Sequence, residues 1–329
     1  MIILIKRILS QRKFTYLCAH CSNKSMANFF RKVYLGIMKR LKFLPSPKYV
    51  GYYYEYYTGK KYKDENPTEF NEKIQWYKAH FRPQILNQLV DKYAVREYVK
   101  EKIGEEYLNE CLGVYDKVSD IDFDTLPNKF VIKAVHGYGF NLIVPDKSKL
   151  NRAKAKLKMQ KWMHRNQYFR GGQEWAYKDI KPRLVIEKYL DELGRGSITD
   201  YKFYCFGGKP EFVEVHLDRE QNHKSGFFDL NFELLPFRDV PENKWIKGSQ
   251  VEKPENFAQM IEVAEKLADR FPFVRVDMYS IRGQIIFGEM TFYPADGRDD
   301  FKPEKYNKIL GDKFILPALP VNKTEIKNF

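Results

Sequence analysis

Two adjacent segments near the C-terminal end of the chain alternate between apolar and polar side chains. Residues 273–279 and 284–291 are rich in β-branched and aromatic residues, which is typical of β-strands. The four residues between them end in Gly283, a residue that suits a tight turn. The pattern therefore predicts a β-hairpin over residues 273–291.

The same reasoning predicts further elements along the chain. Apolar and β-branched runs predict strands at residues 129–134, 142–144, 183–190, 199–206 and 211–217. Apolar residues that recur every three or four positions predict helices over residues 66–77, 91–99, 150–170 and 254–270. The chain therefore mixes strands with helices.

Each strand of the predicted hairpin carries one carboxylate among apolar neighbours, Asp277 and Glu289. A hairpin would bring the two side chains together, and buried carboxylates repel each other unless a cation neutralises them. A hard divalent cation with oxygen ligands, such as Mg²⁺ holding a nucleotide phosphate, meets that need. Arg275 points to the same face as Asp277 and would add a positive group. The alternative is that both carboxylates lie in water at strand ends.

A second stretch combines a strand lysine with a glycine loop. Lys133 lies on the apolar strand that runs into His136, Gly137 and Gly139. Glycines let backbone N–H groups approach phosphates closely, but this spacing is not that of the Walker motif. Taken alone, the stretch favours a plain hairpin turn over a phosphate loop. His136 is then a loop histidine rather than a metal ligand or a base.

Residues 1–48 are basic, and their apolar residues recur near helical spacing. They fit either an interfacial helix drawn to anionic lipid or a helical extension packed on the body of the protein. Cys18 and Cys21 invite a zinc interpretation, but no second Cys or His pair follows at the spacing of a zinc finger. Pro45 and Pro47 predict a linker after this segment.

Composition and net charge limit the classes of protein to which the chain can belong. The 329 residues carry a formal net charge of +14, with 43% hydrophobic and 30% charged residues. A chain of this composition is globular, and its charge predicts anionic partners. The four cysteines are too few and too scattered for a disulfide framework, and no apolar run has the length of a membrane span. We therefore expect a cytoplasmic protein, with a membrane-surface contact through residues 1–48 as one interpretation.

Five short sequence words occur in a characteristic order. They are FNEKIQW at residues 70–76, DKYAVRE at 91–97, VIK at 131–133 with His136 and Gly137, DYKF at 200–203, and GEMTFYP at 288–294. Their order resembles the ATP-grasp superfamily, in which the D-alanine–D-alanine ligases offer the clearest comparison. More closely, the words are similar to those of the TupA-like ATP-grasp family, which is linked to bacterial surface polysaccharide synthesis.

This resemblance implies an α+β fold of the ATP-grasp type, in which two α+β subdomains clasp ATP. It divides the chain into a basic helical N-terminal extension at residues 1–48 and a helical region at residues 49–118. A small lid subdomain at residues 119–190 and a large subdomain with the metal site at residues 191–329 complete the expected organisation.

The resemblance also implies a nucleotide site. Lys92 and Lys133 would contact the phosphates, and the glycine loop would close over them. The backbone at the end of the strand of residues 183–190 would hold adenine, and Asp200 would take the ribose hydroxyls. The expected nucleotide-binding set is Lys92, Lys133, His136, Gly137, Gly139, Glu187, Lys188, Tyr189, Leu190 and Asp200.

On the same basis, Asp277 and Glu289 would bind Mg²⁺, and Arg275 and Lys202 would be the catalytic cations. Many ATP-grasp enzymes have an asparagine two residues after the glutamate as a further metal ligand. Here that position is Thr291, a weaker oxygen ligand, so a second Mg²⁺ stays an open question.

The chemistry that follows is ATP-dependent joining of a carboxylate to an amine through an acyl phosphate. The resemblance implies a uronic acid of a capsular or cell-wall glycan as the acid, an amino acid or another amine as the partner, and no nucleic acid. One alternative is a glycosyltransferase that uses a nucleotide-sugar, although no Asp-x-Asp pair follows a Rossmann unit. Another is a non-catalytic protein that binds polyanions.

Overall fold

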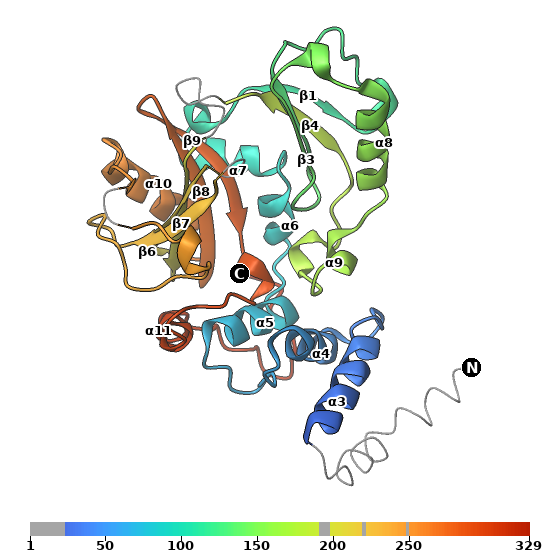
Figure 1. Cartoon of the computed structure of the whole chain (residues 1–329), viewed down its shortest axis with the longest axis vertical. Coiled ribbons are helices and arrows are strands. Elements are labelled where there is room, and N and C mark those ends of the chain that lie inside the picture. Colours follow the sequence, from blue (N-terminus) through green and yellow to red (C-terminus); the bar gives the residue numbers. More distant parts are fainter. Residues whose placement is uncertain (1–23, 191–197, 219–221, 248–249) are drawn as a thin grey trace.

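The computed structural model of the chain describes residues 24–190, 198–218, 222–247 and 250–329. In this part of the chain the strands form two antiparallel sheets, which lie on either side of two short helices (Figure 1). The smaller sheet has the order β1-β4-β2-β3 and contains β1 (Cys111–Tyr115), β2 (Phe130–Ala134), β3 (Asn141–Val144) and β4 (Leu184–Lys188). The larger sheet has the order β7-β6-β5-β8-β9 and contains β5 (Asp200–Phe206), β6 (Lys209–Leu217), β7 (Lys224–Phe228), β8 (Phe273–Ile281) and β9 (Gln284–Thr291).

The predicted hairpin is confirmed as β8 and β9, which pair antiparallel. Its turn is shorter than expected, because Ser280 and Ile281 belong to β8. Arg282 and Gly283 form the turn with φ of 52° and 78°. Positive φ at both central residues matches the right-handed twist of the two strands.

Each sheet is covered on one face by a helix and its apolar residues. Helix α10 (Phe257–Ala268) packs against β5, β6 and β8, and α8 (Arg152–Met163) packs against β2. Lys133 alternates along β2 with buried Ile132 and Ala134, and Lys202 alternates along β5 with Tyr201 and Phe203. The charged residues therefore lie on the sheet faces that the helices do not cover.

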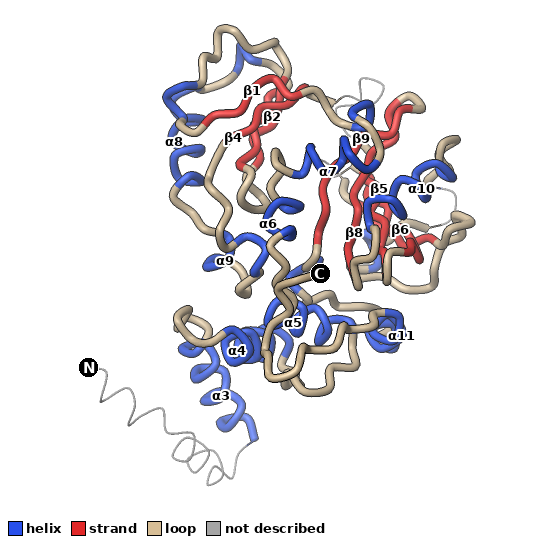
Figure 2. Tube along the Cα trace, turned by 180° about the vertical axis from the view of Figure 1, so that it is seen from behind, coloured by secondary structure: helices blue, strands red, loops and turns tan. Residues whose placement is uncertain are grey.

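The two short helices between the sheets are α6 (Ile85–Val90) and α7 (Val95–Lys102) (Figure 2). The predicted helix over residues 91–99 starts later than expected. Asp91 accepts hydrogen bonds from the N–H groups of Tyr93 and Ala94 at 2.8 and 2.9 Å, which holds a turn ahead of α7. Lys92 consequently lies in this turn rather than in the first turn of the helix.

A layer of helices lies below the sheets, as Figure 1 shows. It contains α3 (Lys24–Met38), α4 (Ser46–Thr58), α5 (Phe70–His80) and α11 (Lys305–Lys313). The linker expected at Pro45 and Pro47 is wrong, because α4 begins at Ser46 with Pro47 in its first turn, where proline is well tolerated. Among the described helices, none combines the length and the apolar character needed to cross a membrane.

The helix predicted over residues 150–170 is interrupted. It ends at Met163, and a short helix α9 (Gln167–Arg170) follows. Between them the side chain of Asn166 donates a hydrogen bond to the carbonyl oxygen of Lys178 at 2.8 Å, which ties the break to the segment leading into β4.

Some expectations fall outside the described residues. These are the zinc interpretation of Cys18 and Cys21 and the N-terminal half of the basic extension. The division of the chain into four regions stays a prediction. One detail bears on it: β1 pairs with β4, so residues 111–115 join the smaller sheet although they precede the expected boundary at residue 119.

Candidate active site

The uncovered face of the larger sheet carries a row of charged side chains. Antiparallel pairing sets Asp277 opposite Glu289 on one side and opposite Lys202 on the other. The next pair along the hairpin is Arg275 and Thr291. Because paired residues project to the same face of a sheet, the expected approach of the two carboxylates is confirmed.

Asp277 is buried between two cations. Arg275 donates two hydrogen bonds to it, from Nε to Oδ1 at 2.7 Å and from Nη2 to Oδ2 at 2.8 Å. The ammonium group of Lys202 contacts the same Oδ2 atom. A carboxylate that is 1% exposed is compensated by such contacts, and each of these cations is also held in place by the acid.

Glu289 lies at the edge of the same charged row. Lys92 Nζ is 3.1 Å from its Oε2 atom, and Arg275 Nη2 is 3.8 Å from its Oε1 atom. Removal from water raises the pKa of Glu289, but Lys92, Lys202 and Arg275 outweigh this effect and hold the pKa well below its usual value. Glu289 is therefore ionised near neutral pH.

The smaller sheet supplies a matching pair, Lys133 and Glu187, whose Nζ and Oε2 atoms are 2.6 Å apart. Burial lowers the pKa of Lys133, but Glu187 outweighs it, with Glu289 and Asp200 adding to the rise. Glu289 and Asp200 belong to the larger sheet. The charges of the two sheets therefore act on one another.

Lys92 connects Glu289 of the larger sheet to the glycine loop. Its backbone N–H donates to the carbonyl oxygen of Val135 at 3.4 Å, directly before the loop. Gly139 has a φ of 71°, which favours glycine, and a Cβ at Gly137 would lie 2.8 Å from the ring of Phe140. The backbone of Gly139 and the space beside Gly137 thus both favour glycine.

His136 turns away from the charged row. Its Nε2 atom donates to the carbonyl oxygen of Trp162 at 3.0 Å, and its ring packs near that of Phe140. Burial lowers the pKa of His136, so the imidazole is neutral. It behaves as a structural loop histidine here, and its inclusion in the nucleotide set stays a prediction.

At the end of β4, both backbone groups of Lys188 are hydrogen-bonded to neighbouring residues. The N–H of Lys188 donates to the carbonyl oxygen of Glu110 at 3.0 Å, and its own carbonyl accepts from Asn109 Nδ2 at 2.9 Å. Any adenine contact therefore depends on Tyr189 and Leu190, which follow β4. The roles of Lys188, Tyr189 and Leu190 stay predictions.

Asp200 occupies the first position of β5, where it is buried beside Lys202. Its Oδ2 atom lies 3.6 Å from Lys202 Nζ. The face that carries Asp200 continues into Lys202 and Asp277, so the expected ribose ligand and the expected catalytic groups line one surface.

A cavity of about 340 Å³ opens beside one end of the β8–β9 hairpin. Its walls include Arg275, Glu289 and Thr291 from the hairpin and Tyr138 from the glycine loop. Elements of both sheets thus border one hollow, which places the chemical groups next to a space for a second molecule.

Sequence reasoning missed a group of charged residues on the far side of this cavity. Lys78 on α5 and Asp296 are both buried and form an ion pair of 2.6 Å. Glu174, Asp296 and Arg298 line the cavity. Two of them closely follow the GEMTFYP word, and this position was the signal that could have marked them. Glu174 is far from every word in the sequence and offered no signal.

The oxygen atoms of Asp277, Glu289 and Thr291 form a hard donor set on adjacent strands. In the described part of the chain, no group of three or more His, Cys, Asp or Glu side chains is arranged to hold a metal by itself. Two carboxylates and a hydroxyl still fit Mg²⁺, because this ion keeps several non-protein oxygen ligands. In this structure Lys202 and Arg275 neutralise Asp277, and Lys92 pairs with Glu289.

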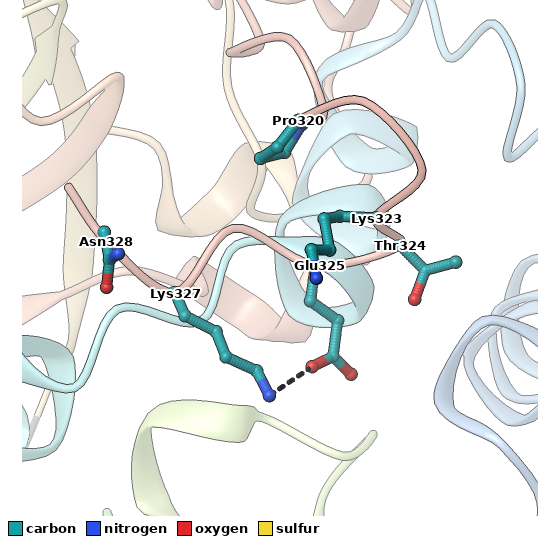
Figure 3. Close-up of a pocket in the computed structure, with 6 residues that line it drawn as sticks. All are labelled: Pro320, Lys323, Thr324, Glu325, Lys327 and Asn328. Atoms are coloured by element: carbon teal, nitrogen blue, oxygen red, sulfur yellow. Dashed lines mark ion pairs between the residues drawn. The ribbon is translucent and has the colours of Figure 1, made fainter.

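A separate cavity near the C-terminal tail has none of these features (Figure 3). Its polar contact is an ion pair of 3.5 Å between Lys327 and Glu325. It is lined by Pro320, Lys323, Thr324, Glu325, Lys327 and Asn328. None of the predicted site residues borders it.

Two antiparallel sheets that carry lysines, acids and a glycine loop define a protein of the ATP-grasp class. The sequence model of the TupA-like ATP-grasp family matches residues 72–315, which is more than half of the chain. The chain therefore belongs to the TupA-like ATP-grasp family. This membership gives the glycosyltransferase alternative no support.

The solved structures that match the chain are distant from it. They include D-alanine–D-alanine ligase from Bacillus anthracis complexed with ATP (17% identity, 63% of this chain and 55% of that chain, TM-score 0.35). Others are D-alanine–D-alanine ligase from Helicobacter pylori (15%, 77% and 68%, 0.39) and a RimK domain ATP-grasp protein from Sphaerobacter thermophilus (12%, 70% and 69%, 0.38). The chain spans about half the length of the first of these. No curated protein matches the chain significantly in sequence.

Proposed function

We propose that this protein is an ATP-dependent ligase that joins a carboxylate to an amine. The observation that carries the proposal is the ion pair between Lys92 and Glu289. The charge of Glu289 also adds to the rise in the pKa of Lys133, which lies on the smaller sheet. Cations from both halves of the chain and acids from the hairpin thus surround one space. Phosphoryl transfer depends on positioning and charge neutralisation, which such an arrangement supplies.

In this proposal Lys92 and Lys133 bind the phosphates of ATP, and the loop of Gly137 and Gly139 covers them. Asp200 receives the ribose, and adenine lies beside Glu187 against the backbone that follows β4. Asp277, Glu289 and Thr291 would hold Mg²⁺, which supplies neutralisation of phosphate charge. Arg275 and Lys202 bind the charge that develops on the transferred group.

The proposed reaction has two steps. An oxygen of the substrate carboxylate attacks the γ-phosphorus, the bond to the β-phosphate oxygen breaks, and ADP leaves. The amine nitrogen then attacks the carbonyl carbon of the acyl phosphate, the carbon–oxygen bond to phosphate breaks, and an amide and phosphate form. Enclosure under the glycine loop excludes water, which would otherwise hydrolyse the acyl phosphate.

For the substrates we propose a uronic acid of a capsular or cell-wall polysaccharide and an amino acid or another amine. The support is the resemblance of the sequence words to the TupA-like family, together with a net charge of +14 that favours acidic partners. We place the reaction in the cytoplasm, where ATP is available and where free thiols such as those of Cys111 and Cys205 persist.

The test is ADP release from Mg·ATP across a panel of glucuronic, galacturonic and mannuronic acid, each combined with glycine, alanine, lysine or glutamate. We expect release that requires both an acid and an amine. Arg275→Met should abolish it, whereas Arg282→Met, at the exposed tip of the same hairpin, should leave it unchanged. Release of UDP from a nucleotide-sugar, without ADP release for any pair, would contradict the proposal.

We also propose that α3 lies against an anionic membrane surface. Phe29, Phe30, Val33 and Ile37 are exposed on this helix, and the exposed Lys32, Arg40 and Lys42 are nearby. Apolar residues beside cations fit a bilayer that presents anionic headgroups.

Sedimentation with vesicles tests this contact. We expect the full-length protein to bind vesicles of phosphatidylserine and phosphatidylcholine but not vesicles of phosphatidylcholine alone. Phe29→Ser with Phe30→Ser should weaken binding, and Ile309→Ser, which changes an exposed apolar residue on α11, should not. Equal binding of wild type to both kinds of vesicle, or none to either, would show that α3 does not serve this role.

A further inference from the structure

Most of the net positive charge of the chain lies in one segment, residues 147–170, which contains α8 and α9. The segment has nine Lys and Arg residues and no Asp or Glu. Without it, the formal net charge of the chain would fall from +14 to +5. A surplus that is concentrated in this way attracts anionic partners more strongly than the same charge spread over the whole surface.

Three lysines of α8 form a stripe along the exposed side of this helix. Lys154, Lys158 and Lys161 follow one another at spacings of four and three residues, so they lie on one side. All three are exposed, and in the described part of the chain no acid forms an ion pair with them. The buried residues of α8, which face the smaller sheet, are Ala155, Met159 and Trp162. We call the three lysines the α8 lysine stripe.

The charges of α8 work against the stability of the helix that carries them. Its first turn contains Arg152 and Lys154 and no acid, although the N-terminus of a helix favours negative charge. Lys154 and Lys158 are like charges four residues apart, which repel each other. Asp124 compensates Arg152, with Oδ1 2.5 Å from Nη2, but no described acid does the same for the stripe. An anion bound along the stripe would relieve both unfavourable effects.

The basic segment continues from α8 to the glycine loop. Figure 1 shows α8 on the outer side of the smaller sheet and α9 between this sheet and the layer of helices. On α9, Arg170 donates a hydrogen bond from Nη1 to the carbonyl oxygen of Tyr138 at 3.4 Å. Tyr138 lines the 340 Å³ cavity together with Arg275 and Glu289. The segment therefore leads towards the groups assigned to phosphoryl transfer.

The chemistry of this surface favours an acidic polysaccharide over other polyanions. Leu157 is the one large apolar residue that is exposed on α8, a helix that the structure describes in full. A membrane contact needs an apolar face, and single-stranded nucleic acid needs aromatic rings on which its bases stack. Trp162, the aromatic residue of α8, is only 4% exposed. Charge without apolar or aromatic surface fits a hydrophilic chain that carries carboxylates on successive units.

We propose that the α8 lysine stripe binds an acidic polysaccharide, and that the acid substrate is a unit of such a polymer rather than a free sugar acid. The inference rests on the proposed ligase function and adds to it a docking surface outside the active site. Attraction between exposed charges raises the concentration of an anionic chain near the cavity. The stripe therefore affects the KM for a polymer, while kcat and the KM for a single sugar acid do not depend on it.

A triple variant of the full-length protein tests the proposal by combining Lys154→Glu, Lys158→Glu and Lys161→Glu. Glutamate and lysine have similar helix propensities, so the fold should be kept. The first readout is the Kd for fluorescein-labelled polygalacturonate, measured by fluorescence anisotropy. The second is the KM in ADP release for the best acid of the panel, supplied as the single sugar and as its polymer.

The control is a second triple variant that makes the same change in net charge elsewhere. It changes exposed lysines outside the segment and combines Lys244→Glu, Lys266→Glu and Lys305→Glu. We expect the stripe variant to raise the Kd and the KM for the polymer by roughly tenfold, the effect of three exposed ion pairs. Its kcat and its KM for the single sugar should be unchanged, and the control variant should match wild type. Added salt should weaken the binding of the polymer by wild type.

Three results would overturn the docking surface. One is the absence of polygalacturonate binding by wild type. Another is an equal loss of binding in both triple variants, because net charge alone would then explain the binding. The third is tighter binding of single-stranded DNA than of polygalacturonate by wild type, with both lost in the stripe variant. The stripe would then be a nucleic-acid surface.

The outcomes also separate this inference from the ligase function. If the polymer binds through the stripe but no acid and amine pair causes ADP release, the ligase function is contradicted and the docking surface stands. If ADP release occurs and the KM for the polymer is unchanged in the stripe variant, the docking surface alone is contradicted.

Discussion

Asp277→Asn is the substitution that most directly tests the charged row of the larger sheet. Asn keeps the shape of the side chain but removes the charge that compensates Arg275 and Lys202. Both cations are nearly buried in the structure, with 13% and 4% of their side chains exposed. The variant therefore leaves two desolvated positive charges facing a neutral amide.

The size of the effect follows from this burial. Removing one partner of a buried ion pair costs about 3–5 kcal/mol of stability. The same substitution at Asp269, which pairs with Lys102 at 3.0 Å on the surface, should cost at most about 1 kcal/mol. For a protein of this size we expect Tm to fall by roughly 4–7 °C in Asp277→Asn and to change little in Asp269→Asn.

Thermal unfolding with and without Mg·ATP separates stability from function. A ligand at 100 times its Kd stabilises a protein by about 2.7 kcal/mol, so wild type should melt at a higher temperature when Mg·ATP is present. Asp277→Asn should lose this shift together with ADP release. Adding Lys202→Met to Asp277→Asn removes one uncompensated cation, so the double variant should regain part of the lost Tm but none of the activity.

Two results would refute this reasoning. If Asp277→Asn is as stable as wild type, the charges of Arg275 and Lys202 do not depend on the acid. If the double variant is no more stable than Asp277→Asn, the loss comes from packing rather than from charge. Retained Mg·ATP stabilisation in Asp277→Asn would contradict the metal role of this residue.

Two further substitutions test Lys133 and Glu214, an acid on β6 that lies opposite Lys202 of β5. Lys133→Met should raise the KM for ATP by roughly 10–100-fold, the equivalent of one lost charge-assisted hydrogen bond. Lys149→Met, which changes an exposed lysine, should leave the KM unchanged. An unchanged KM in Lys133→Met would show that Lys133 does not bind the phosphates. Burial raises the pKa of Glu214, but His216, Arg275 and Lys202 outweigh it and lower the pKa to about 2. Because the pKa of Glu214 is lower in the folded than in the unfolded chain, its ionisation stabilises the fold above the unfolded pKa, and this contribution is lost as the pH falls. In denaturant unfolding, the free energy of unfolding of wild type should fall by roughly 3 kcal/mol more than that of Glu214→Gln between pH 6 and pH 2. Parallel pH profiles of the two proteins would contradict this.

The hairpin was predictable because its information is local. Alternation marks both strands, but the turn has two residues instead of the expected four, and a β-bulge between Asp277 and Met278 shifts the register by one residue. The bulge sets Asp277 opposite Glu289 rather than Gly288, so their approach depends on a feature that alternation does not show. For Lys133 on β2, whose burial pattern alternates along the strand, the local pattern was enough.

Predictions failed where a side chain decided a boundary. Lys92 was expected inside a helix, but the side chain of Asp91 bonds to the N–H groups of Tyr93 and Ala94 and delays the helix by a turn. The linker expected at Pro45 is a helix start instead, because proline suits the first turn of a helix as well as a linker. Both sequences are compatible with either structure, so apolar periodicity and proline content alone did not fix the boundaries.

The residues of the cavity wall could not be predicted from the sequence, for a different reason. Burial and the charge of Asp296 raise the pKa of Glu174, and the two residues are separated by more than a hundred positions along the chain. No periodic pattern marks a carboxylate that is buried outside a strand or helix. The candidate phosphate and metal residues could be proposed from short words, because each word places its residues within a few positions of one another. The cavity wall depends on which distant segments the chain brings together, so its residues can be identified only once the chain is folded.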